Sequence, residues 1–264
     1  MDPARRRSYL DALELEAWVL RGSAPPAEAV ADVAAQPVAE PPQQSRFAPG
    51  AERAPAAHEA PEAPEAPEVL AKPPLVLPRD WAGLREAAAQ CRHCALCETR
   101  QQAVFGVGVE RAELMVVGEG PGAEEDRQGE PFVGQAGQLL DRMLAAIGHS
   151  RQHNVYIANV VKCRPPGNRD PKEEEAEACR PYLEAQLELV QPKLILALGR
   201  VAAQRLLNSS EPLARLRGQQ HSWGPQDTPL LATYHPAYLL RSPREKAKAW
   251  ADLKQARRML ESQA

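Results

Sequence analysis

Four short apolar runs alternate with helical stretches in the second half of this chain. The apolar runs lie at residues 114–117, 154–161, 193–198 and 229–234. The helical stretches lie at about residues 135–147, 171–190, 200–207 and 242–260. Strands that alternate with helices pair in parallel, and the helices then cover both faces of the sheet. The sequence therefore predicts an α/β fold, a three-layer α/β/α domain around a central, mainly parallel four-stranded sheet.

The first apolar run ends in a glycine-rich loop, Gly118-Glu119-Gly120-Pro121-Gly122. Such a loop turns sharply and lets a ligand approach the backbone closely. Dinucleotide-binding loops have a similar pattern, but their fingerprint needs a helix directly after the glycines. Here we expect the next helix only from about Gln135, after three acidic residues and a Pro-Phe-Val-Gly turn that contains Phe132. The stretch is predicted to form a pocket wall.

Several motifs fall at or just past the ends of the predicted strands. They are the glycine loop, the segment that follows Asn159, the Gly199-Arg200 turn and the segment His235-Pro236-Ala237-Tyr238. In an open parallel sheet, ligands bind at the edge where the strands end. A lone Asn at a strand end usually satisfies backbone groups, and a lone His there is more often structural than catalytic. These motifs nevertheless indicate a binding site, because all of them are predicted at the same edge of the sheet.

The chain has five cysteines, at positions 91, 94, 97, 163 and 179. Cys91 and Cys94 have the spacing that clamps a zinc ion or one edge of an iron-sulfur cluster, and Cys163 and Cys179 supply two more thiols. Both metals fit this spacing, and five unrelated reduced thiols are the alternative. The sequence has no apolar run of membrane-spanning length and no secretory signal, so we expect a cytoplasmic protein without disulfides.

Two of these motifs resemble a known family. The pattern GEGPGxxED, followed by G.PFVG.AG.LL, resembles the first signature of the family-four uracil-DNA glycosylases, the iron-sulfur members of their superfamily, and HPAYLLR resembles the second. The resemblance covers roughly residues 84–260. It implies an enzyme that hydrolyses the N-glycosidic bond of uracil in DNA and leaves an abasic site for base excision repair. It also implies a 4Fe-4S cluster held by Cys91, Cys94, Cys163 and Cys179, with Cys97 as an accessory thiol.

The resemblance implies roles for residues of the pocket. Asn159 matches a residue that reads uracil, because an amide complements the O4 acceptor and the N3–H donor of this base. Phe132 matches the residue on which the base stacks, and Glu125 matches one that crowds C5, where thymine has a methyl group. His235 matches the donor to uracil O2, which the backbone from Gly118 to Gly120 assists as charge develops on the leaving base.

The second signature implies the DNA contacts. Leu239 or Leu240 is expected to fill the gap left by the flipped base, and Arg241 with Ser242 is expected to contact phosphate. In the best-known family of uracil glycosylases an Asp that orients water occupies the place of Gly120, a Gly that family four shares. Glu119 is our candidate for ordering water or for stabilising the sugar cation.

Two other functions fit part of the pattern. Uracil-DNA cross-linking proteins share both signatures but insert a KRRIH-type loop, whereas this chain has CRPPGNRDPKEEE after Asn159, which favours a turnover enzyme. A non-catalytic module that recognises uracil or single strands is the second alternative, and the missing water-activating Asp supports it. The net charge of -3 decides little, because a local basic patch suffices for DNA binding.

The first third of the chain lies outside the resemblance. Of the 26 prolines, 14 precede Trp81, in Ala-, Pro- and Glu-rich sequence that predicts a disordered linker over residues 23–80. Residues 1–22 are predicted to contain an amphipathic helix that docks on its own domain or on a partner. This peptide resembles the N-terminus of the psi subunit of the bacterial clamp loader, which implies a replisome partner. Residues 81–264 are predicted to form the catalytic domain, a monomer.

Overall fold

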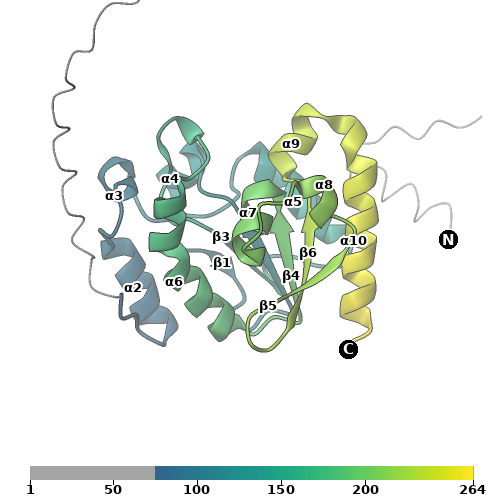
Figure 1. Ribbon diagram of the computed structural model, residues 1–264, viewed down its shortest axis with the longest axis horizontal. Coiled ribbons are helices and arrows are strands. Elements are labelled where there is room, and N and C mark those ends of the chain that lie inside the picture. Colours follow the sequence, from purple (N-terminus) through teal and green to yellow (C-terminus); the bar gives the residue numbers. More distant parts are fainter. Residues whose placement is uncertain (1–74, 264) are drawn as a thin grey trace, which may run out of the picture. The chain divides into compact units, whose positions relative to one another are not determined.

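The computed structural model describes residues 75–263 (Figure 1). The predicted peptide of residues 1–22 and the predicted linker up to residue 74 lie outside these residues. The helices are α2 (Trp81–Gln90), α3 (Leu96–Thr99), α4 (Ala123–Gln128), α5 (Gln135–Ala145), α6 (Glu173–Val190), α7 (Gly199–Leu207), α8 (Leu213–Leu216), α9 (Pro236–Arg241) and α10 (Lys246–Glu261), with 3-10 turns η1 (Pro166–Asn168) and η2 (Pro243–Glu245). The strands are β1 (Val107–Gly108), β2 (Leu114–Gly118), β3 (Val155–Asn159), β4 (Leu194–Leu198), β5 (Gln220–Trp223) and β6 (Thr228–Thr233).

The strands form one sheet in the order β1-β3-β2-β4-β6-β5. The inner strands β3, β2, β4 and β6 are parallel, which confirms the predicted four-stranded core. The edge strands β1 and β5 pair antiparallel with β3 and β6 and were not predicted. β1 has only two residues and β5 is largely polar, so neither shows the apolar pattern that identifies a strand.

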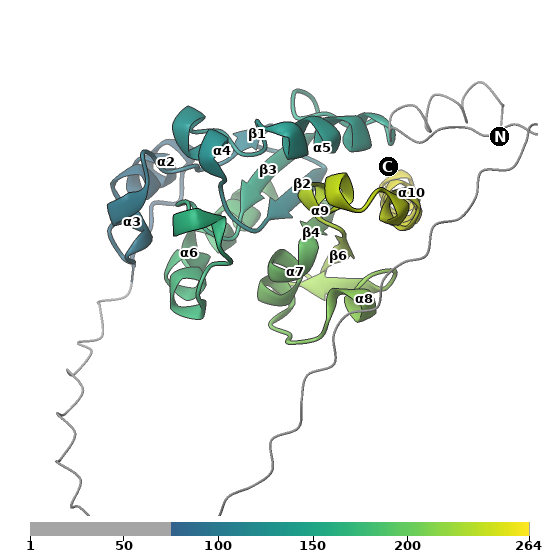
Figure 2. The same cartoon turned by 90° about the horizontal axis from the view of Figure 1, so that it is seen from above.

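Alternate residues of the inner strands face two separate cores, because successive side chains in a strand point to opposite faces. Met115 and Ile195 belong to one core with α2, α6 and α7, here named the α6-side core. Val116 and Leu196 belong to the other with α5, α9 and α10, here named the α5-side core. Figure 2 shows the sheet between these two layers of helices. The predicted three-layer α/β/α architecture is confirmed.

The short helix α4 begins directly after the glycine loop, so the expectation of no helix before Gln135 is wrong. Three acidic residues occupy its first turn, where they interact favourably with the helix dipole. The Gly122 N–H donates to Glu125 Oε2 at 3.1 Å and closes the N-terminus. A six-residue helix is too short to show apolar periodicity, which is why the sequence did not reveal it. Helix position therefore does not separate this loop from a dinucleotide-binding loop, and the side chains around it must do so.

The described part of the chain begins with an extended segment that packs on the domain. Leu75 and Leu77 lie against the α6-side core, within the last residues of the range predicted as linker. At the other end of the sequence, α10 packs along the α5-side core through Leu253 and Leu260. Among the described helices, none combines the length and the apolar character needed to cross a bilayer.

Candidate active site

A cavity of about 410 Å³ lies at the carboxyl edge of the sheet. The glycine loop, α4, the Pro-Phe-Val-Gly turn, the segment after β3 and α9 all contribute to it. Of the residues predicted for the site, it is lined by Glu119, Gly120, Glu125, Phe132, Asn159, His235 and Arg241. The topology thus brings together residues that are more than a hundred positions apart in the sequence.

Gly118 allows the two sides of the cavity to meet. It ends β2 beside Asn159, its register partner in β3. A Cβ atom at Gly118 would lie 2.4 Å from Asn159 Oδ1 and 2.7 Å from Phe132 Cζ, both closer than real Cβ contacts. Only glycine therefore leaves room for the amide and the aromatic ring together.

The Asn159 side chain is buried, yet its Oδ1 atom has no hydrogen-bond partner among the described residues. Its peptide is fixed, because Lys162 Nζ donates to the Asn159 carbonyl at 2.8 Å. Leaving a buried polar atom unpaired costs free energy, so such an atom indicates a partner from outside the chain. An amide oxygen accepts, and the missing partner must be a donor.

Phe132 has a left-handed backbone conformation, with φ of 56°. Its carbonyl receives a hydrogen bond of 3.0 Å from Arg151 Nη2, and Gly137 lets α5 approach that carbonyl so closely that a Cβ would lie 1.8 Å from the oxygen. Surrounding contacts therefore hold a conformation that costs energy in itself, which is common at functional sites. The Phe132 ring lies 5.5 Å from the His235 ring, at 31°.

The Glu125 carboxylate connects the glycine loop to the turn that carries Phe132. Oε1 accepts from the Val133 and Gly134 N–H groups at 3.0 and 3.2 Å, and Oε2 accepts from Gly122. Glu125 lines the cavity as predicted. Its oxygens are engaged with backbone N–H groups, so its chief structural effect is to fix the wall of the cavity.

His235 precedes α9 and presents a defined tautomer. The Ala237 N–H donates to His235 Nδ1 at 3.2 Å, so in the neutral ring the proton is on Nε2. Burial, and then the charge of Arg241, lowers the pKa of His235 to about 4, while Glu125 acts in the opposite direction. Gly199, with φ of 88°, lets the ring pack here, since a Cβ would lie 3.0 Å from His235 Cβ. His235 is therefore a neutral donor at physiological pH.

The helical form of HPAYLLR corrects the prediction for Leu239. This side chain is fully buried in the α5-side core, so it does not reach a ligand. Tyr238 is instead 37% exposed and lines the cavity, although it was not predicted as a site residue. Leu240 is partly buried against the same core, and Ser242 caps the end of α9. No helix was predicted over these residues, so the sequence could not show that Tyr238 lies on the exposed side of α9.

Three further lining residues come from the segment between β3 and α6, namely Asn168, Arg169 and Asp170. The sequence showed them only as part of CRPPGNRDP, which was used to argue against a cross-linking loop. Burial, and then the neighbouring Asp170 carboxylate, raises the pKa of Glu119 to about 7, while Arg200 opposes this effect. The cavity thus contains a carboxyl group that ionises near neutral pH.

All five cysteines line a second hollow, with Arg100, Lys162 and Tyr182 around them. Arg100 Nη1 donates to Cys163 Sγ at 2.8 Å, and the Lys162 N–H donates to Cys179 Sγ at 3.2 Å. Burial raises the pKa of Cys94, of Cys163 and, to about 12, of Cys179. In residues 75–263 no three His, Cys, Asp or Glu side chains converge as ligands of a single metal ion. The five thiols therefore share one hollow, in which two of them receive N–H donors.

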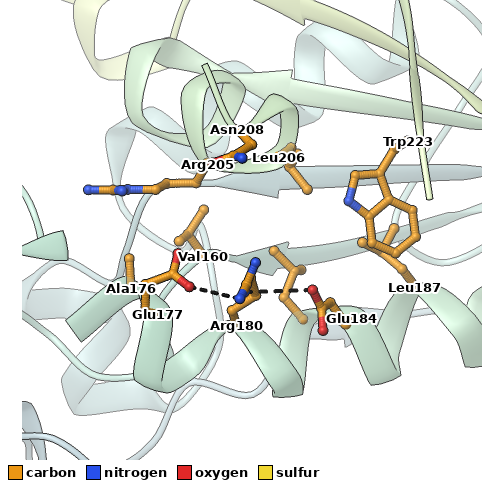
Figure 3. A pocket seen from close by; sticks show the side chains of 11 residues that line it. Val160, Ala176, Glu177, Arg180, Glu184, Leu187, Arg205, Leu206, Asn208 and Trp223 are labelled. Atoms are coloured by element: carbon orange, nitrogen blue, oxygen red, sulfur yellow. Dashed lines mark ion pairs between the residues drawn. The ribbon is translucent and has the colours of Figure 1, made fainter. Parts of the chain in front are cut away.

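A smaller hollow of about 120 Å³ lies between α6 and α7 and is bounded by Trp223 (Figure 3). Arg180 forms ion pairs with Glu177 and Glu184 along its rim, as the dashed lines in Figure 3 show. None of the predicted site residues lines this hollow. The predicted site residues that line a cavity outside the cysteine hollow are thus at the carboxyl edge of the sheet.

Comparison with known proteins gives consistent matches. The model of the Uracil DNA glycosylase superfamily matches residues 105–254, which include every residue that lines the large cavity. The chain is 47% identical over 171 residues to the type-4 uracil-DNA glycosylase of Archaeoglobus fulgidus, over 62% of this chain and 85% of the relative. It is 43% identical over 160 residues to that of Thermotoga maritima, over 60% and 81% respectively. A type-5 uracil-DNA glycosylase of Thermus thermophilus is 34% identical over 152 residues, over 50% and 68%.

Proposed function

Because this chain belongs to the uracil DNA glycosylase superfamily, as a type-4 enzyme that excises uracil from DNA for repair, we propose that the large cavity holds the flipped uracil. The unpaired Asn159 Oδ1 carries this proposal, since it needs a donor and uracil presents N3–H there. Cytosine presents an acceptor at N3, so its binding would leave two buried acceptors facing each other. The site therefore distinguishes uracil from the base that produces it.

Phe132 and His235 complete the recognition of the base. The base stacks on Phe132, in contact of the kind that contributes ~1 to 3 kcal/mol. The His235 Nε2–H donates to uracil O2, with help from the backbone between Gly118 and Gly120. Glu125 fixes the wall that crowds C5, and this excludes the methyl group of thymine. The tautomer of His235 and the glycine contacts support these roles.

The reaction is hydrolysis of the bond between C1′ and N1. As that bond breaks, its electron pair leaves with uracil as an anion, and the sugar develops cationic character. The donor from His235 stabilises the charge on O2, which is where preorganised hydrogen bonds contribute most. Water then forms a bond to C1′, and Glu119 accepts its proton. A carboxyl group that ionises near neutral pH is suited to this step.

DNA lies across α9 and the edge of the cavity. Tyr238, together with Leu240 two positions further along α9, fills the gap that the extruded nucleotide leaves in the stack, and Arg241 and Ser242 contact phosphate. The exposure of Tyr238 at the cavity supports this assignment. The correction for Leu239 does not affect the proposal, because its neighbours on α9 provide the contact.

The cysteine hollow holds a 4Fe-4S cluster, with Cys91, Cys94, Cys163 and Cys179 as ligands and Cys97 as an accessory thiol. The common hollow that these thiols line, and the two N–H donors to Sγ atoms, support this assignment. Hydrolysis needs no electron transfer, so the cluster stabilises the fold. It connects the segment after α2 to the end of β3 and to α6.

The N-terminal peptide of residues 1–22 binds the clamp loader and brings a monomeric, cytoplasmic enzyme to the replisome. Its amphipathic spacing and its resemblance to the psi subunit support this proposal. A pull-down from a bacterial lysate with residues 1–25 as bait is the test, with Trp18→Ala in the same peptide as control. Capture of clamp-loader subunits by the natural peptide alone would support it, and their absence would refute it.

The decisive experiment is a glycosylase assay on an oligonucleotide with a single uracil, with alkali to cleave abasic sites. The natural chain should release uracil over many turnovers. Asn159→Ala and His235→Ala should each lose about 10²- to 10³-fold in kcat, whereas the exposed His153→Ala should not. Binding without release would favour the non-catalytic module, and a stable covalent adduct would favour the cross-linking proteins.

A further inference from the structure

One arginine side chain binds the backbone of the turn that carries Phe132. Arg151 lies in the segment between α5 and β3, and its side chain is only 12% exposed. Nη1 donates to the Pro131 carbonyl at 3.2 Å, and Nη2 donates to the Phe132 carbonyl at 3.0 Å. Nε donates to Asp141 Oδ1, on α5, at 2.9 Å. The planar guanidinium group therefore holds two consecutive carbonyls and is itself held by a carboxylate.

Glu125 binds the same turn just beyond Phe132. Its Oε1 atom accepts from the N–H groups of the next two residues, Val133 and Gly134. The φ of 56° at Phe132 is unfavourable for an L-residue, and apart from glycine only Asn, Asp and Gln share a positive φ elsewhere in residues 75–263. Such a conformation persists where its surroundings over-determine it. Here a guanidinium group binds the carbonyls up to Phe132, and a carboxylate binds the N–H groups after it.

We propose that Arg151, anchored by Asp141, is a positioning residue for Phe132: it keeps this residue in the left-handed conformation and so keeps the ring where uracil stacks. The inference rests on the proposed function, because it deepens the role given to Phe132 in binding the base. Neither Arg151 nor Asp141 lines the cavity, so their effect on the reaction passes through Phe132. Relaxation of φ to a negative value would redirect the Cα–Cβ bond and move the ring from its place beside Gly118.

The shape of the guanidinium group matters to this role. An ion pair with Asp141 alone could be formed by a lysine, whose ammonium group is a single point charge. In Arg151 all three side-chain nitrogens have an acceptor, and two of these acceptors are carbonyls of the turn. A lysine at this position keeps the charge but loses the fixed fork. Arg151→Lys should therefore restore only part of what Arg151→Gln removes.

The first test is structural and needs no DNA. In a crystal structure of the intact Arg151→Gln variant, Phe132 should have a negative φ, and its ring should have left its place beside Gly118. This result is expected whether or not the variant is active. If Phe132 keeps its positive φ and its ring position without the guanidinium group, the inference is wrong, while uracil excision as the function is unaffected.

The second test is a double-mutant cycle on the single-turnover rate of uracil release. Arg151→Gln should lower this rate about tenfold, within the range expected when a base loses its stacking partner. Phe132→Ala should lower the rate by itself, and Arg151→Gln added to it should cause no further loss, because Arg151 acts through the ring. A merely structural role of Arg151 would lower the rate by the same factor with and without the ring, and that outcome would overturn the inference.

Two control variants complete the experiment. Arg205→Gln removes the guanidinium group of another ion pair, with Glu173, and Leu260→Ala weakens the α5-side core; neither residue lines the cavity. Both should keep the natural rate at temperatures where thermal melts show them folded. If Leu260→Ala loses as much rate as Arg151→Gln, general destabilisation explains the loss and the inference fails. Failure of the natural chain to release uracil would instead refute the proposed function, and the φ of Phe132 in Arg151→Gln would still test the positioning.

Discussion

At the residue scale, Gly118 determines whether the cavity can contain a base. A methyl group there would contact Asn159 Oδ1 and Phe132 Cζ, so one of the two side chains would have to leave its place. We predict that Gly118→Ala lowers kcat/KM for uracil excision about 100-fold or more, since misplacement of about 1 Å has effects of this size. The clash should also cost about 1 to 3 kcal/mol of stability, as overpacking of a buried site does. Steady-state kinetics with a thermal melt measure both.

Gly224 provides the control for Gly118. It has φ of 70°, but no atom lies within 4 Å of a Cβ built on it. Gly224→Ala should therefore lose about 1 kcal/mol of stability from backbone strain and keep full activity. Equal activity of the two alanine variants would show that Gly118 is not needed for the shape of the cavity.

His235 makes the stability of the fold depend on pH in a definite direction. Its pKa is near 4 in the folded chain and about 6.5 in the unfolded chain. Below pH 6.5 the His235 ring binds a proton in the unfolded chain but remains neutral in the folded chain. The free energy of unfolding therefore decreases as pH falls from 6.5 towards 4. We predict that, between pH 7.5 and pH 5, the free energy of unfolding of the natural chain decreases by about 2 kcal/mol more than that of the His235→Gln variant. Urea denaturation at the two pH values measures it, and parallel losses would contradict the buried, neutral state.

At the scale of elements, α9 turns one side of HPAYLLR into core and the other into binding surface. Tyr238 is exposed, whereas the adjacent Leu239 is buried. We predict that Tyr238→Ala weakens uracil excision about tenfold in double-stranded DNA and less in single strands, where no stack has to be opened. Leu239→Ala should instead cost 2 to 5 kcal/mol of stability, as a buried leucine does. Excision assays on the two substrates, with urea melts, distinguish these roles.

The elements that could be predicted from the sequence are those that are long or wholly apolar. The four inner strands are buried on both faces except at the start of β6, and α5, α6, α7 and α10 are long enough to show their pattern. Helix α4 was missed because six residues are too few to show apolar periodicity. Leu239 was predicted to contact DNA because the side of α9 on which a residue lies depends on where that helix begins. Asp170 was missed for another reason. It lines the same cavity as Glu119 only because separate segments approach each other in the fold, which no local pattern records.

At the scale of the whole molecule, the cysteine hollow brings together three segments that are far apart in the sequence. Cys91 and Cys94 flank the turn after α2, Cys163 follows β3 and Cys179 is in α6. Lys162 connects this hollow to the pocket, because its N–H donates to Cys179 Sγ and its ammonium group to the Asn159 carbonyl. Loss of a ligand should therefore affect folding and, through β3, the position of Asn159.

This connection is tested by replacing a proposed ligand, Cys179, with the accessory thiol Cys97 of the same hollow as the control. Cys179→Ser should remove the bound iron and sulfide and lower the melting temperature by about 10 °C or more, because the free energy of binding the cluster is part of the free energy of folding. Cys97→Ser should keep the iron and the melting temperature, since Cys97 is not one of the four proposed ligands. Iron and sulfide content and a thermal melt are measured on both purified chains. If Cys97→Ser loses its iron while Cys179→Ser retains it, Cys97 is a ligand and Cys179 is not. The connection from the cluster through β3 to Asn159 would then not involve Cys179.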